Sequence, residues 1–387
     1  MFCATLFLLT PDYLLLFTMM KTALVIGGTG PTGPYIVNGL LARGYTVTIL
    51  HSGSHEVAFD QEVEHLHADV HFRETLEAAL GTREWDLCIA AYGRLKLNAE
   101  LLAGRTGRVI AMGGSTGALA HADDARWGRI GPAANLDELR GLHEADAARN
   151  KFGYQMARAE EALFAAHAAG HYQATQIAYP ILYGPRQPGA HDWCVMRRVL
   201  DGRRRFIIAD GGIKLEARAF AANAAHAVLL AVDQPEVSAG QKYLMSDVPL
   251  YSMRQRIAAI ARIMGHEFEF IDLPYDLAVP CHVLWRRQRS CRFRDTGKIQ
   301  RELGYRDLVG PEDALAESVR WLLENRPDAG GELEHQLGDP FDYEREDRLI
   351  EHWLAARAAL PATDYPLPPA AHMYRHPDKV NEGWKRP

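Results

Sequence analysis

The chain has 387 residues, of which 48% are hydrophobic and 24% charged, and its formal net charge is -6. A chain of this length can bury a sizeable core, and its composition is ordinary for a soluble globular enzyme. The acidic balance argues against a nucleic-acid binder that works by bulk electrostatics, so we expect no nucleic-acid partner.

The cysteines indicate a reducing compartment. There are five of them, and no two have the CxxC spacing of redox or zinc motifs: Cys3, Cys88, Cys194, Cys281 and Cys291. An odd number without that spacing predicts free thiols, no disulfide framework and no metal site. We therefore expect a cytoplasmic protein.

Residues 1–20 form an apolar stretch that is split by Pro11 and Asp12. No basic region precedes it and no small-residue cleavage site follows, which disfavours a signal peptide. Each apolar piece is too short to span a bilayer. We interpret residues 1–19 as a mis-called or disordered extension, with Met19 or Met20 as the natural start; a membrane-surface anchor is the alternative.

From Lys21 to Pro185, apolar runs with strand character alternate with segments of helical spacing. Strands are predicted at 21–30, 45–50, 63–70, 85–93, 107–115 and 172–185, and helices at 34–44, 73–80 and 151–170. A polar loop covers about 120–150. This alternation is typical of a parallel, doubly wound α/β sheet. Beyond Pro185 the pattern is mixed, with helices expected at 196–202, 252–265 and 311–326 and short strands at 206–212 and 267–274.

A glycine-rich loop follows the first strand and precedes the first helix: Gly27-Gly28-Thr29-Gly30-Pro31-Thr32-Gly33. In the G-x-x-G-x-x-G pattern, Gly27 permits the tight turn, Gly30 lets the backbone approach a pyrophosphate, and Gly33 allows close helix–strand packing. The helix N-terminus adds amide donors and a partial positive charge. The loop, including Pro31 and Thr32, predicts a dinucleotide site.

The choice between NAD and NADP is normally determined just after the second strand. The chain has His51-Ser52-Gly53-Ser54-His55 there, with neither an acid for the ribose hydroxyls nor an arginine for a 2′-phosphate. We favour NADP slightly and keep NAD open.

Other candidate cofactor contacts follow later strands. Asp69, after the third strand, could accept from the adenine amino group, or it could only cap a turn. Ala90 and Ala91 are small residues where the dinucleotide would pass, and Tyr179 completes the expected set.

Two further motifs carry a family resemblance. Gly113-Gly114-Ser115-Thr116-Gly117 follows the fifth strand, and Tyr154-Gln155-Met156-Ala157-Arg158 lies on the next predicted helix, with Glu161 three residues later. The chain resembles the extended short-chain dehydrogenase/reductases, the NAD-dependent epimerase/dehydratase-like family. The resemblance covers roughly Lys21 to Asn325 and includes Tyr183-Gly184-Pro185 and residues 298–305.

The resemblance implies a Ser/Thr and Tyr-x-x-x-Lys catalytic set. Tyr154 would be the acid/base for hydride transfer, because a nearby cation can lower a tyrosine pKa toward neutrality. Ser115 would orient the substrate oxygen, with Thr116 as an alternative. Arg158 stands where the family has lysine; it keeps the charge but has a different shape and gives up no proton.

The resemblance also implies the domain organisation and assembly. We expect a Rossmann dinucleotide-binding domain at 20–185, a smaller, mainly substrate-binding domain at 186–330, and a C-terminal extension at 331–387. A homodimer through the helices after the fourth and fifth strands is expected.

The expected activity is an NAD(P)-dependent oxidoreductase acting on a carbonyl or secondary alcohol. Tyr183, His191 and Trp193 are candidate substrate contacts, which suits an apolar or aromatic carbonyl. The alternatives are an epimerase or dehydratase with retained cofactor and a dinucleotide-binding module without catalysis. Nucleotide sugars are less expected, because Tyr179-Pro180-Ile181-Leu182 replaces the family's Arg-Pro-x-Asn and Gly117-Ala118 follows Thr116.

Overall fold

The computed structural model describes residues 21–91, 94–113, 151–284 and 291–361. The chain forms two compact units, residues 1–341 and 342–387, which we describe separately. The predictions for residues 1–20, Ser115 and Thr116 therefore lie outside the described residues.

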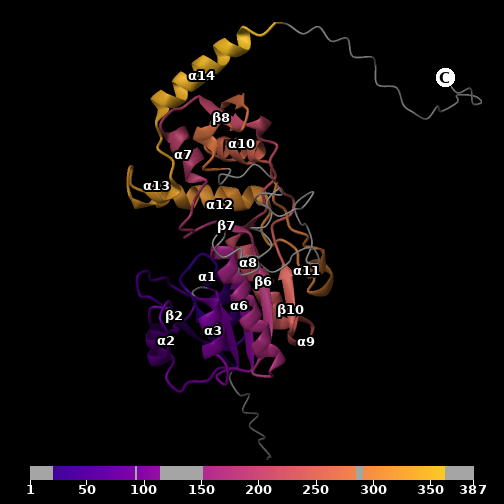
Figure 1. The fold of residues 1–387 in the computed structure, drawn as a ribbon. Coiled ribbons are helices and arrows are strands. Elements are labelled where there is room, and N and C mark those ends of the chain that lie inside the picture. Colours follow the sequence, from indigo (N-terminus) through magenta and orange to yellow (C-terminus); the bar gives the residue numbers. More distant parts are fainter. Residues whose placement is uncertain (1–20, 92–93, 114–150, 285–290, 362–387) are drawn as a thin grey trace, which may run out of the picture. The chain divides into compact units, whose positions relative to one another are not determined.

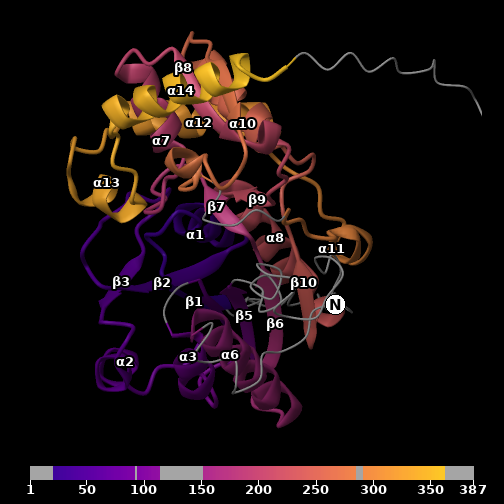
Figure 2. The ribbon, with the colours of Figure 1, turned by 45° about the horizontal axis from the view of Figure 1, so that its top comes forward.

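The first unit is built on a seven-stranded sheet with the strand order β10-β6-β5-β4-β1-β2-β3 (Figure 2). All of its strand pairs are parallel. The strands are β1 (Lys21–Ile26), β2 (Tyr45–His51), β3 (Glu64–His67), β4 (Leu87–Ala90), β5 (Arg108–Gly113), β6 (Gln173–Ala178) and β10 (Gln241–Leu244). Central strands such as β4 are buried along their whole length, as expected for a parallel sheet covered on both faces.

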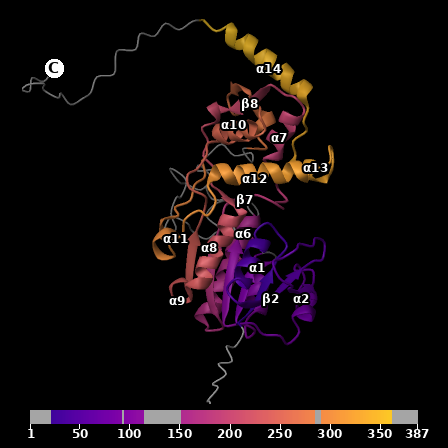
Figure 3. The same ribbon diagram turned by 180° about the vertical axis from the view of Figure 1, so that it is seen from behind.

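Helices cover both faces of this sheet. On one face, α1 (Gly33–Leu41) and α8 (Ala221–Asp233) share an apolar core with inward-facing strand residues. On the other, α2 (Arg73–Leu80), α3 (Leu95–Leu101) and α6 (Lys151–Ala168) enclose a second core. Figure 1 shows α3 and α6 in front of the sheet, and Figure 3, from behind, brings α1 and α8 forward.

The rest of the first unit contains two small parallel strand pairs, β7 with β9 and β8 with β11. Their bounds are β7 (Ile181–Tyr183), β8 (Arg205–Ala209), β9 (Arg218–Phe220) and β11 (Glu269–Leu273). The remaining helices are α7 (Trp193–Leu200), α9 (Pro235–Ser238), α10 (Met253–Ile263), α11 (Gly297–Glu302), α12 (Pro311–Glu324) and α13 (Glu332–Leu337). Helix α10 packs against both α7 and α12.

The second unit contains α14 (Tyr343–Ala358), whose N-terminus is capped by the Asp342 carboxylate, which accepts from the Arg345 amide at 3.1 Å. Among the described residues, no helix is long and apolar enough to cross a membrane.

The predicted fold class, a doubly wound parallel Rossmann sheet followed by a smaller C-terminal part, is confirmed; the substrate-binding role expected of that part stays a prediction. Strand β10 returns to this sheet after the chain has passed through β8 and β9, so sequence order does not separate the sheet from the segments beyond Pro185.

Candidate functional site

The glycine loop joins the buried strand β1 to helix α1, at the carboxyl edge of the sheet. The Gly27 amide donates to the Leu50 carbonyl at 2.8 Å, which ties the start of the loop to β2. Gly27 has φ +90°, a backbone conformation that residues other than glycine rarely adopt. Thr32 is buried directly before the helix.

Steric contacts explain why other loop positions are glycine. A Cβ on Gly33 would overlap the carbonyl of Gly28, and one on Gly28 would lie 2.7 Å from the Ile49 side chain. A Cβ on Gly30 would meet only the Gly27 carbonyl oxygen, at 3.6 Å. Gly28 and Gly33 therefore permit tight internal packing, whereas Gly30 keeps a surface free of side chain.

Small side chains border the loop. Ala90 ends β4 beside β1 and is buried, and the Ala91 amide donates to the Ile26 carbonyl at 2.9 Å. An extended ligand crossing the carboxyl ends of β1 and β4 would thus meet backbone and methyl groups. This is the place where dinucleotides bind in doubly wound sheets.

The end of β2 differs from the sequence expectation. His51 is buried and faces His65, with 3.1 Å between His51 Nε2 and His65 Nδ1, and burial lowers the pKa of His51. Glu56 folds back so that its Oε1 lies 3.9 Å from His51 Nε2. Ser52 remains exposed and donates to Ser54 at 3.0 Å. A carboxylate, that of Glu56, is therefore present beside the end of β2.

Asp69 makes the contacts of a turn cap. Its Oδ1 accepts from the His71 amide at 2.9 Å and lies 2.8 Å from His71 Nδ1, and these hydrogen bonds lower the pKa of Asp69. The Asp69 carboxylate is half exposed, and its partner is His71, two residues away in the same turn. This is the alternative role that the sequence left open.

Tyr154 lies in the first turns of α6. The same helix approaches the carboxyl end of β5 through Met156, whose side chain would lie 2.8 Å from a Cβ on Gly113, the last residue of β5. Tyr154 is partly exposed. Arg158 is 48% exposed and donates to Glu161 Oε2 at 2.8 Å, so its charge is shared with a carboxylate on the same helix.

A shallow, open hollow lies among the segments after β6. Aromatic, apolar and charged side chains line it together: Tyr183, Glu216, Arg218, Asp247, Pro249, Leu250, Tyr251, Met253, Arg256 and Pro311. Of the three candidate substrate contacts, Tyr183 is among them. His191 and Trp193 are not; the Trp193 indole is buried and donates to Glu334 at 2.9 Å.

The charges around the hollow are buried. Arg218 pairs with Glu216 at 3.1 Å, and Arg256 pairs with Asp192 at 2.6 Å while lying over the Tyr183 ring. Burial raises the pKa of Asp247 to about 6, although Asn223, Tyr183 and the Phe220 amide donate to its carboxylate. Such preorganised charges suit a ligand with polar groups.

Tyr179 follows β6, and its amide donates to the Gly113 carbonyl at 3.1 Å. Its side chain packs against the core, and burial raises the pKa of its hydroxyl to about 12. Tyr179 thus lies at the same edge of the sheet as Gly113.

Sequence reasoning missed the group His51, Glu56, His65 and His67, whose candidate ligand atoms all lie within 4.8 Å of one another. The prediction of no metal site considered only cysteine spacing. The available signal was the His-x-His spacing on one strand together with a histidine at the end of its neighbour.

Structural comparison identifies proteins of the same fold. A UDP-glucose 4-epimerase with UDP-glucose from Thermotoga maritima has a TM-score of 0.60 and 16% identity, covering 79% of this chain and 100% of its own. A UDP-glucuronic acid 4-epimerase from Bacillus cereus in complex with NAD gives 0.58 and 13%, with the same coverage. A dTDP-glucose 4,6-dehydratase from Bacillus anthracis in complex with NAD gives 0.59 and 13%, covering 79% and 97%.

No family model and no curated protein matches the sequence. At these identities the structural likeness establishes the fold, and the expected resemblance to extended short-chain dehydrogenase/reductases is confirmed at that level. The chemistry has to be argued from the site.

Proposed function

We propose that the protein is an oxidoreductase that binds a nicotinamide dinucleotide and transfers hydride to or from a carbonyl or secondary alcohol. The observation that carries the proposal is the glycine loop at the carboxyl end of β1, with Gly30 free of steric contacts and the small residues of β4 beside it. The dinucleotide found in two neighbours of the same fold supports it.

In this proposal the pyrophosphate lies on the loop from Gly27 to Gly33, with Pro31 and Thr32 beside it, and the amides at the start of α1 donate to it. The cofactor supplies or accepts the hydride. Ala90, Ala91 and Tyr179 border the path toward the nicotinamide end, and Ser52 lies on the ribose side.

Tyr154 is assigned the proton transfer on the substrate oxygen, and Ser115 or Thr116 the orientation of that oxygen. The approach of helix α6 to the end of β5 through Met156 supports this assignment, because α6 carries Tyr154 and Ser115 follows β5 by two residues. Arg158 is assigned the cationic role beside the ribose, which requires it to leave Glu161 or to act together with it.

Glu56 favours NAD over NADP. A carboxylate beside the end of the second strand can accept from ribose hydroxyls and repels a 2′-phosphate. Glu56 folds back toward His51. We therefore replace the slight preference for NADP by a preference for NAD, for the protein without a bound metal ion.

The hollow supports a polar substrate. Arg218 and Arg256 are paired with Glu216 and Asp192, and Asp247 adds a further carboxyl group, so the lining carries both signs of charge. Tyr251 adds an aromatic ring. This disfavours a wholly apolar carbonyl and suits a substrate that carries both polar groups and a flat or apolar part.

The second candidate is an epimerase or dehydratase that oxidises its substrate and reduces it again with a retained cofactor. The names of the structural neighbours and the charged lining of the hollow favour it. Purified protein that holds dinucleotide and converts a UDP- or dTDP-sugar without net change at 340 nm supports this candidate, whereas steady production of NADH or NADPH supports the first.

Two finer expectations also belong to the proposal. A homodimer through α3 and α6 follows from the resemblance, and light scattering at micromolar concentration tests it. Cytoplasmic location follows from the cysteine pattern and is tested by fractionation of cells that express the full chain.

Tyr154→Phe is the direct test of the chemical assignment. It should lower turnover by about 100-fold to 10,000-fold while leaving dinucleotide binding intact. Tyr45→Phe is a matched control, because Tyr45 is the first residue of β2 and lies at the amino ends of the strands, away from the glycine loop. Turnover in Tyr154→Phe equal to the wild type would remove Tyr154 from the mechanism.

A further inference from the structure

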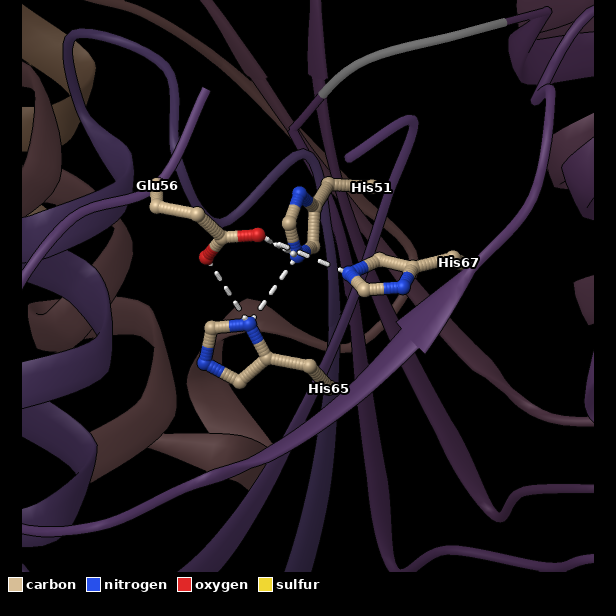
Figure 4. Close-up of side chains that lie close together, drawn as sticks. All are labelled: His51, Glu56, His65 and His67. Atoms are coloured by element: carbon tan, nitrogen blue, oxygen red, sulfur yellow. Dashed lines mark hydrogen bonds and ion pairs between the residues drawn. The ribbon is translucent and has the colours of Figure 1, made fainter. Parts of the chain in front are cut away.

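Four side chains with metal-ligating atoms converge at the open edge of the seven-stranded sheet (Figure 4). Three are imidazoles, from His51 at the end of β2 and from His65 and His67 on the terminal strand β3. The fourth is the Glu56 carboxylate, from the segment between these strands.

The sheet register explains why the three histidines share one face. His67 is the partner of His51 across the parallel pair, and His65 is the partner of Ile49. Side chains two apart on a strand point to the same side, so His65 and His67 both lie on the face of His51. The arrangement therefore follows from the backbone pairing as well as from the side-chain conformations.

The spacing of the ligand atoms fits one small cation. His51 Nε2 and His65 Nδ1 are 3.1 Å apart, and Glu56 Oε2 lies 3.2 Å from His65 Nδ1. Glu56 Oε1 lies 3.6 Å from His67 Nε2 and 3.9 Å from His51 Nε2. A tetrahedral zinc ion with bonds of about 2.0–2.1 Å needs ligand atoms about 3.3 Å apart.

We propose that His51, His65, His67 and Glu56 form a binding site for a divalent transition-metal ion, with Zn²⁺ as the best fit. Three imidazoles and one carboxylate suit zinc, whereas Mg²⁺ and Ca²⁺ require mostly oxygen ligands. The proposal rests on the geometry of these four side chains and does not require that a dinucleotide binds.

The ion has an open entry path and a well-defined inner wall. The side chains of Glu56 and His67 are 58% and 57% exposed, whereas that of His51 is 3% exposed. An ion can therefore enter from solvent on the Glu56 side and meet the buried imidazole last. Once bound, it links the ends of β2 and β3 to the segment that carries Glu56.

Binding requires a change of tautomer at His51. The Gly53 amide donates to His51 Nδ1 at 3.2 Å, which places the ring proton on Nε2, where it faces His65 Nδ1. A metal ion at Nε2 needs that lone pair, so the ring proton moves to Nδ1 and the Gly53 amide loses this acceptor. The Gly53 amide is thus a local reporter of occupancy.

Zinc binding to untagged full-length protein, measured by competition with a chromophoric chelator, tests the proposal. A polyhistidine tag must be absent because it binds the same ions. We expect one Zn²⁺ per chain, a visible tetrahedral d–d spectrum after Co²⁺ loading, and a shift of the Gly53 amide NMR signal. His65→Ala and His67→Ala should each weaken zinc binding by more than the roughly 10-fold to 100-fold that outer-shell partners contribute.

Two further variants keep the test decisive. Glu56→Gln changes only an exposed side chain, so weakened binding in this variant cannot come from unfolding. His171→Ala removes an exposed histidine elsewhere in the first unit and should leave binding unchanged. Binding that is absent in the wild type, or equal in the wild type, Glu56→Gln and the His65 and His67 variants, would overturn the proposal.

Discussion

Gly33 at the start of α1 lies so close to Gly28 that a Cβ on residue 33 would overlap the Gly28 carbonyl group. The helix that is expected to receive the pyrophosphate is therefore held against its own loop by the absence of a side chain. Gly30, between them, has no such neighbour, since its nearest contact would be the Gly27 carbonyl oxygen at 3.6 Å.

This contrast predicts different outcomes for two alanine variants. Gly33→Ala should destabilise the protein by about 1–3 kcal/mol, because the loop must move to accept the methyl group. Gly30→Ala should change the free energy of unfolding by less than about 0.5 kcal/mol yet weaken dinucleotide binding, because its methyl group enters the ligand's side of the loop. Urea denaturation and calorimetric titration measure the two effects; a stable Gly33→Ala variant would contradict the packing argument.

Substitution of Arg158 tests whether helix α6 takes part in catalysis. Arg158→Lys restores the family's usual residue, and it should change turnover without affecting the Tm, because the side chain is exposed and pairs only locally with Glu161 among the described contacts. Tyr154→Phe should lower turnover by about 100-fold to 10,000-fold, the usual contribution of general acid–base catalysis. Turnover that is the same in the wild type and both variants would show that this helix takes no part in the chemistry.

Asp247 should make stability depend on pH. Burial raises its pKa to about 6 from an ordinary value of 3.8. An acid with a raised folded-state pKa stabilises the fold fully below its unfolded pKa, and this stabilisation is lost as the pH rises through about 6. Between pH 4 and 7 the loss amounts to about 3 kcal/mol at most.

Urea denaturation from pH 4 to 7 measures this dependence. Asp247→Asn should flatten the decline, because the amide cannot ionise, while the exposed Asp328→Asn should leave it unchanged. A decline that is identical in all three proteins would place its origin in other groups.

The fold could be predicted from the sequence where periodicity and turn signals were strong. Strands were predicted at 21–30, 45–50 and 85–93, where β1, β2 and β4 lie, and helices at 34–44 and 151–170, where α1 and α6 lie. Strand β10 was missed: its four residues alternate little, and its place beside β6 is set by tertiary pairing that a local pattern does not contain. Helix α3 was missed for a similar reason, since seven residues give barely two turns of periodicity.

The candidate site could be predicted only in part. Its motifs are contiguous in the sequence, whereas the hollow is lined by residues from distant segments. The glycine loop and the Tyr154 helix are contiguous in sequence. The hollow brings together Tyr183, Arg218, Asp247 and Arg256 from segments up to 73 residues apart, and only Tyr183 was assigned a substrate contact. Glu56 escaped notice because it lies five residues beyond β2 and folds back onto it.

A metal ion at the histidine cluster should alter the choice of dinucleotide. Without the ion, the Glu56 charge opposes a 2′-phosphate; with Zn²⁺ bound, the local charge becomes positive. We expect Zn²⁺ to shift the ratio of the NAD and NADP dissociation constants toward NADP by roughly tenfold relative to protein in EDTA. Glu56→Gln should show a smaller shift, and an unchanged ratio in the wild type would separate the cluster from the ribose site.

The most direct test of the central claim is dinucleotide binding to the purified wild-type protein, measured by thermal denaturation and calorimetry with NAD, NADP and their reduced forms. We expect a dissociation constant in the micromolar range or below and a stabilisation on the order of 2–4 kcal/mol at 100-fold to 1,000-fold excess over Kd. In EDTA, NAD should raise the Tm more than NADP. No rise in Tm with any of the four, and no heat of binding, would contradict the account, because the roles given to Tyr154 and Ser115 depend on a nicotinamide lying beside them.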